Sequence, residues 1–102
     1  MTITKRPQAF VDLDGLAAYL ALEATPALAI RFLVSVEKTL DRLAAMPGLG
    51  APYESEHPRL KGVRHAPVRG FPNDYLFYTE QPTGGIELIR VVHAKRDLPS
   101  TL

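Results

Sequence analysis

The chain has 102 residues, of which 46% are hydrophobic and none is cysteine. This length fits a single core, so we expect one compact domain over residues 1–102. The absence of cysteine excludes disulfides, thiolate metal sites and cysteine nucleophiles. No apolar run reaches the roughly 18 residues that span a bilayer, and the first residues lack the apolar core of a signal peptide. These features predict a cytoplasmic protein with no membrane partner.

The formal net charge of +1 conceals two halves of opposite charge. Residues 12–56 contain seven acidic against three basic side chains, whereas residues 57–102 contain seven basic against four acidic ones. No acid occurs between His57 and Asn73. A basic half suggests an anionic partner, either nucleic acid or an acidic protein segment. The alternative is a solvated sheet edge, because lysine and arginine commonly protect edges from aggregation.

The first half of the chain predicts an edge strand at residues 2–6 and then two helices. Pro7 suits the first turn of a helix, where its missing N–H is not needed. Apolar residues then recur at three- and four-residue steps and predict one helical face, made of Phe10, Leu13, Leu16, Ala17 and Leu20. Because this helix is too short to be stable alone in water, we expect it to pack against the second as an antiparallel hairpin.

The second helix has clear start and stop signals. Thr25 is the expected N-cap and Pro26 the first helical residue, and residues 46–48 end the helix. Its apolar stripe comprises Ala29, Phe32, Leu33, Val36, Leu40, Leu43 and Ala44.

Three strand-like runs follow a proline- and glycine-rich loop at residues 47–62. The first, residues 63–68, contains Pro67, which favours an edge strand or a bulge. The second, residues 75–79, is entered by a turn at residues 71–74, and a hairpin loop at residues 81–85 leads to the third, residues 86–92. Tyr75 and Tyr78 should face opposite sides of the sheet. The order β-α-α-β-β-β predicts an α+β fold, a small mostly antiparallel sheet covered by a helical hairpin.

The last predicted strand ends abruptly in the polar residues His93, Lys95, Arg96 and Asp97. Polar groups at a strand's end lie at the rim of a sheet, where recognition or chemistry is possible. Three plainer interpretations stay open: a solvated tail, a His93 that anchors the next turn, and a surface ion pair of Asp97 with Arg96 or Arg90.

The motifs also form a pattern in chain order. The first helix carries Ala9, Asp12, Leu13, Leu16, Tyr19 and Leu20, and the second carries Ala29, Phe32, Leu40 and Leu43, with Pro47 and Gly50 at its exit. The strands carry Gly62, Arg64 and Pro67, then Tyr75, Phe77 and Tyr78, and finally Arg90-Val91-Val92-His93 followed by Arg96-Asp97. In this order and spacing, nearly the whole chain resembles the ParE/RelE superfamily of type II toxin–antitoxin toxins.

The resemblance implies a cytoplasmic toxin that a cognate antitoxin neutralises by wrapping a segment across the helical hairpin and sheet. RelE-like members cleave mRNA on the ribosome, whereas ParE-like members trap DNA gyrase on DNA. RelE-like toxins often carry a tyrosine near the C-terminus, but no tyrosine follows Tyr78 here. The His93–Arg96–Asp97 ending looks more like the ParE branch. We therefore expect a ParD-like antitoxin, gyrase as the target and no sequence-specific DNA binding by the toxin alone.

In the ParE interpretation the protein has no catalytic residue and no cofactor. The predicted target-binding rim comprises Arg64, Arg69, Arg90, His93, Lys95 and Arg96. In the alternative, a ribosome-dependent endoribonuclease, His93 is the acid or base because histidine titrates near neutral pH. Arg64, Arg69 or Arg90 would then stabilise the phosphate charge. A third possibility is a toxin fold that is no longer toxic and only binds its antitoxin.

Two further groups of residues allow less specific predictions. His57 and His65 have no nearby carboxylate at ligand spacing, so we predict no metal site. Arg31, Lys38 and Arg42 on the second helix form either its solvated face or a surface that an acidic antitoxin segment uses.

Overall fold

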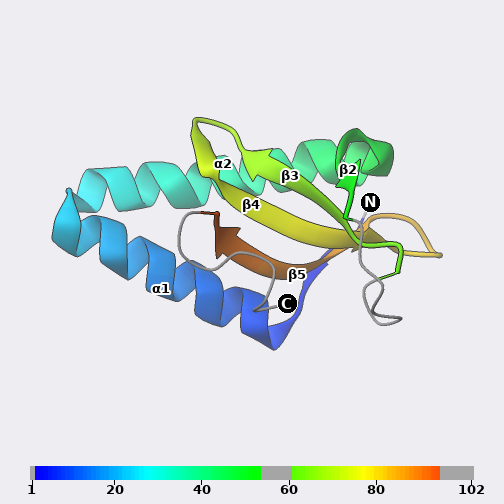
Figure 1. Ribbon diagram of the computed structural model, residues 1–102, viewed down its shortest axis with the longest axis horizontal. Helices are drawn as coiled ribbons and strands as arrows, with labels where there is room; N and C mark the ends of the chain where they lie inside the picture. Colours follow the sequence, from blue (N-terminus) through cyan, green and yellow to red (C-terminus); the bar gives the residue numbers. More distant parts are fainter. Residues whose placement is uncertain (1, 54–60, 95–102) are drawn as a thin grey trace.

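The computed structural model describes residues 2–53 and 61–94, which form two long helices, one short 3-10 helix and a five-stranded sheet. In chain order the elements are β1 (Ile3–Lys5), α1 (Pro7–Glu23), α2 (Pro26–Ala45), η1 (the 3-10 helix Pro47–Leu49), β2 (Ala51–Pro52), β3 (Arg64–Val68), β4 (Phe71–Glu80) and β5 (Ile86–His93). The strand order is β1-β5-β4-β3-β2, with β1 parallel to β5 and the other neighbours antiparallel. Figure 1 shows α1 and α2 as an antiparallel hairpin beside this sheet. The predicted α+β fold is confirmed.

Both helices begin at proline, as the sequence predicts. At the start of α2, the Thr25 hydroxyl accepts a hydrogen bond from the Leu28 N–H at 3.0 Å, which satisfies one of the free donors of the first turn. At the start of α1, Arg6 provides no such side-chain bond. The predicted N-cap of α2 is therefore confirmed.

The main core lies between the helical hairpin and one face of the sheet. Its buried side chains are Ala9, Leu13, Phe32, Val36, Leu40, Leu43, Ala44, Val68, Leu76, Tyr78, Ile86, Leu88 and Val91. The predicted stripe of α2 is buried except at Leu33, which is 39% exposed. On α1, Phe10 is 52% exposed and Ala9 takes the core position instead. Phe10 belongs to the predicted apolar face but lies at its exposed border, where the Lys5 ammonium is 5.8 Å from the centre of its ring, a cation–π contact.

The opposite face of the sheet carries a second apolar cluster. Val63, Phe77, Ile89 and Val92 are buried there. Tyr75 packs against this cluster, whereas Tyr78 is buried in the main core. The two tyrosines therefore face opposite sides of β4, as predicted.

The sheet differs from the prediction at two places. The turn before β4 lies at Arg69–Gly70, and residues 71–74 belong to β4 itself. Two residues suffice because Gly70 has a φ of +83°, in the left-handed region that glycine adopts readily. Residues 51–52, predicted as loop, form β2 and pair with β3. Pro67 predicted either an edge strand or a bulge, and the structure has a shift in the register of β3 and β4 between Pro67 and Val68.

Candidate functional site

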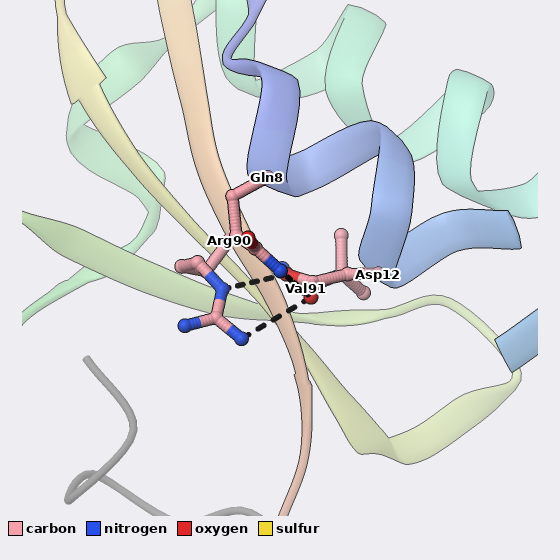
Figure 2. Close-up of polar contacts among 4 residues, drawn as sticks. All are labelled: Gln8, Asp12, Arg90 and Val91. Atoms are coloured by element: carbon pink, nitrogen blue, oxygen red, sulfur yellow. Dashed lines mark hydrogen bonds and ion pairs between the residues drawn. The ribbon is translucent and has the colours of Figure 1, made fainter. Parts of the chain in front are cut away.

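The edge of β5 extends beyond its neighbour β1. Lys5 of β1 lies opposite Leu88, but β5 continues to His93, and α1 packs against β5. Asp12 of α1 reaches this edge (Figure 2). Its carboxylate accepts hydrogen bonds from Arg90 Nε at 2.7 Å, from Arg90 Nη2 at 3.1 Å and from the Val91 N–H at 2.9 Å. A single carboxylate thus pairs an arginine and satisfies a backbone donor on a part of β5 that β1 does not cover.

The Asp12–Arg90 pair is largely shielded from water. The side chain of Asp12 is 9% exposed and that of Arg90 is 20% exposed. Gln8, one turn earlier on α1, donates a further hydrogen bond to Asp12 at 3.2 Å. Asp12 lies beside buried Ala9 and Leu13 on the helix, so the packing of α1 on the core places the carboxylate at β5. The pair therefore fixes the position of α1 relative to the last strand.

His93 ends β5 opposite Asp74 of β4. His93 Nδ1 lies 2.9 Å from Asp74 Oδ1, and the two residues are register partners across the strands. The Asp74 side chain is 12% exposed, whereas that of His93 is 29% exposed. Asp74 and His93 line a hollow against the second half of α1, together with Leu16, Tyr19 and Leu20. The carboxylate therefore orients an imidazole whose other face remains accessible.

Arg64 of β3 and Tyr78 of β4 form a hydrogen-bonded clamp that holds the loop after α2, at Pro47 and Gly50, against the sheet. Arg64 Nη1 donates to the Gly50 carbonyl at 2.7 Å, while the Gly50 N–H donates to the Tyr78 hydroxyl at 2.9 Å. The Tyr78 hydroxyl donates in turn to the Pro47 carbonyl at 2.6 Å. A Cβ added to Gly50 would lie 2.3 Å from the Tyr78 oxygen, so only glycine allows this close approach. Burial raises the pKa of Tyr78, although the Gly50 hydrogen bond and the Arg64 charge act in the opposite direction.

Arg69 lies in the turn between β3 and β4, beside α2. Its N–H donates to the Thr39 hydroxyl at 3.2 Å, and its carbonyl accepts from the Ser35 hydroxyl. These bonds attach the turn to the middle of α2. The side chain of Arg69 lines a groove there together with the basic side chains Arg31, Lys38 and Arg42.

The structure thus places the predicted site residues at separate positions. Arg90 and His93 line one hollow at the α1–β5 edge. Arg64 is bonded to Gly50, and Arg69 lies at α2. Lys95, Arg96 and Asp97 lie outside the described residues. The roles of all six basic residues in target binding stay predictions.

Sequence reasoning missed the carboxylates that hold Arg90 and His93. Asp12 gave a usable signal, because it is an acid next to the core position Leu13 in an apolar helix. Asp74 gave none, since its pairing with His93 depends on the register of β4 and β5.

Among residues 2–53 and 61–94, no group of three or more histidine, aspartate or glutamate side chains is arranged to hold a metal ion. No helix in the same ranges is long and apolar enough to cross a membrane.

The comparison with known families decides the assignment. The family model described as the ParE toxin of the type II toxin–antitoxin system parDE matches residues 3–98. The chain belongs to the ParE toxin family. It is thus a toxin of the type II toxin–antitoxin class, and the predicted resemblance is confirmed.

A solved structure supports the same fold for this ParE-family toxin. The chain is similar to a chain of the chromosomal ParDE toxin–antitoxin system from P. aeruginosa, with a TM-score of 0.72 and 19% sequence identity. The match covers 91% of this chain and 95% of the other. No curated protein matches the sequence.

Proposed function

We propose that this toxin binds DNA gyrase in the cytoplasm, traps it on DNA and is neutralised by a ParD-like antitoxin. The observation that carries the proposal is the match of the ParE toxin family over residues 3–98. In this account the protein acts by binding and has no catalytic residue. The predicted target-binding residues Arg64, Arg69, Arg90, His93, Lys95 and Arg96 contribute to the contact with the target, although Arg64 and Arg69 lie apart from the α1–β5 edge.

The α1–β5 edge supports the proposed contact at Arg90 and His93. Both side chains are partly exposed, and each is held by a buried or nearly buried carboxylate, from Asp12 and Asp74 respectively. Side chains held in one geometry lose little conformational entropy on binding a partner. This edge is therefore suited to a rigid protein–protein contact.

The proposal is tested by inducing the toxin in cells without antitoxin and scoring growth, the SOS response and bulk translation together. Gyrase poisoning predicts growth arrest with SOS induction while translation continues. His93→Ala should weaken the arrest, whereas Lys61→Ala, which removes an exposed cation elsewhere, should leave it intact. An SOS response that stays at its basal level during growth arrest would contradict the gyrase assignment.

A specific observation also favours the second candidate, a ribosome-dependent endoribonuclease. The 2.9 Å contact between Asp74 and His93 is an arrangement that orients a histidine for acid–base chemistry. Arg90 lines a hollow with His93 and would offer positive charge for a phosphate. This candidate predicts cleaved mRNA and rapid loss of translation, both abolished in His93→Ala. Intact mRNA after induction of the wild-type toxin would eliminate it.

A further inference from the structure

A groove between α2 and the β3–β4 turn gathers four basic side chains. Arg31, Lys38 and Arg42 come from α2, and Arg69 comes from the turn. The three helical cations are spaced seven and four residues apart, so they follow one stripe that is about 16 Å long at 1.5 Å per residue. None of the described residues that line the groove is acidic.

These four cations differ from Lys5, Arg6 and Arg90, which pair with acids; Arg64 and Lys61, which also lack an acidic partner among the described residues, lie outside the groove. Lys5 pairs with Glu37, Arg6 pairs with Glu87, and Arg90 pairs with Asp12. Within residues 2–53 and 61–94, by contrast, no salt bridge joins any of the four groove cations to an acid. The acids of α2 do not change this, because Glu37 is bonded to Lys5 and Asp41 does not line the groove. The groove therefore presents a positive charge that no salt bridge among the described residues neutralises.

The same groove has an apolar part. Ile30 is 63% exposed and Val34 is 48% exposed, and Phe71 lines the groove from β4. Ile30 and Val34 lie one helical turn apart, next to the basic stripe. A nucleic acid backbone would pair with the cations but leave these aliphatic side chains exposed. A protein segment that combines acidic and aliphatic side chains would satisfy both parts.

The wall of the groove is held in place before any partner binds. The Thr39 hydroxyl donates to the Ser35 carbonyl at 2.7 Å and accepts from the Arg69 N–H. The Ser35 hydroxyl donates to the Arg69 carbonyl, and Gly70 allows the tight turn that follows. A partner thus meets a formed groove and need not order the turn, which favours affinity.

We infer that this groove, lined by Ile30, Arg31, Val34, Lys38, Arg42 and Arg69, docks an acidic, aliphatic-bearing segment of the antitoxin. The inference rests on the proposed function in that it takes the antitoxin as the partner. An extended segment of about five residues spans the basic stripe at about 3.3 Å per residue. Carboxylates of the segment pair with the four cations, and its aliphatic side chains cover Ile30 and Val34. The groove lies at α2, whereas Arg90 and His93 lie at the α1–β5 edge. The antitoxin site is therefore separate from those two residues and shares Arg69 with the proposed target contact.

The test measures the affinity of purified toxin for the protein encoded by the gene that adjoins the toxin gene. The double variant Lys38→Gln/Arg42→Gln should weaken this complex by about tenfold or more and flatten its dependence on salt concentration. Val34→Ser should weaken it with the salt dependence unchanged. The matched control is Lys61→Gln, which removes an exposed cation outside the groove and should bind like the wild type. Thermal unfolding of each variant confirms that the fold is retained.

If both groove variants bound the antitoxin with an affinity within twofold of the wild type, the inference would be wrong. A 20-base-pair DNA duplex serves as a second probe. If the duplex lost affinity in Lys38→Gln/Arg42→Gln while the antitoxin did not, the groove would be a nucleic-acid surface, and the inference would be wrong. The proposed function is measured separately, because gyrase inhibition by the wild-type toxin does not depend on the outcome for these variants. A wild-type toxin that failed to bind the antitoxin at all would overturn both the proposed partner and the docking site.

Discussion

The Asp12–Arg90 pair allows a quantitative prediction for stability. Asp12→Asn keeps the shape of the side chain but removes the charge and leaves one acceptor oxygen for four donors, which come from Gln8, Arg90 and Val91. Removing one partner of a fully buried ion pair costs about 3–5 kcal/mol, and leaving a buried N–H unsatisfied costs about 1–3 kcal/mol. Because Arg90 is 20% exposed and the asparagine retains one acceptor, we place the loss of unfolding free energy near the lower end, at about 2–3 kcal/mol.

Urea unfolding at constant salt concentration measures this loss. For a chain of this size the total unfolding free energy is about 5–15 kcal/mol, so the change should be large compared with the error of extrapolation. Asp14→Asn is the matched control, since Asp14 is exposed on the same helix and should change stability by about 0.5 kcal/mol or less. A double-mutant cycle with Arg90→Gln should show that the two single losses are not additive. Equal losses for Asp12→Asn and Asp14→Asn would refute the reasoning.

Three further predictions concern the clamp on Gly50 and the start of α2. Gly50→Ala should lower the free energy of unfolding by about 1–3 kcal/mol in urea, because the new methyl group collides with the Tyr78 hydroxyl and displaces the loop. An unchanged free energy of unfolding would show that the loop moves aside freely. The raised pKa of Tyr78 means that the folded state retains the phenolic proton more strongly than the unfolded state. Stability should therefore fall as pH rises above about 10, more steeply in the wild type than in Tyr78→Phe, and parallel curves would contradict this. Thr25→Ala should cost about 1 kcal/mol in thermal unfolding through loss of the N-cap bond, whereas Thr25→Ser should cost less.

Local patterns in the sequence predicted most of the fold. The recurrence of apolar residues along α2, the Thr25–Pro26 start and the loop at residues 81–85 depend on residues close in sequence, and the structure has all of them. The errors arose where local signals compete. Pro72 and Asn73 are typical turn residues, but Gly70 already completes the turn, so β4 begins at Phe71. β2 was missed because a strand of two residues has no periodicity to detect.

The candidate site was only partly predictable for a different reason. Arg90 and His93 stand out as polar residues at the end of an apolar strand, and both lie at the α1–β5 edge. Their partners could not be read from the sequence, because Asp12 is 78 positions from Arg90 and Asp74 is 19 positions from His93. Charge counting along the chain also assigned Arg31, Lys38 and Arg42 to the acidic half at residues 12–56. In the folded chain some basic residues are neutralised by carboxylates, whereas those of the α2 groove have no described ion-pair partner.

The most direct test of the central claim is a DNA cleavage assay with purified gyrase, supercoiled plasmid and the purified toxin. If the toxin poisons gyrase, the wild-type toxin increases the covalent gyrase–DNA complexes, seen as linear plasmid after denaturation, and prior addition of the antitoxin prevents this increase. Unchanged supercoiling and unchanged cleavage complexes at saturating toxin would contradict the account.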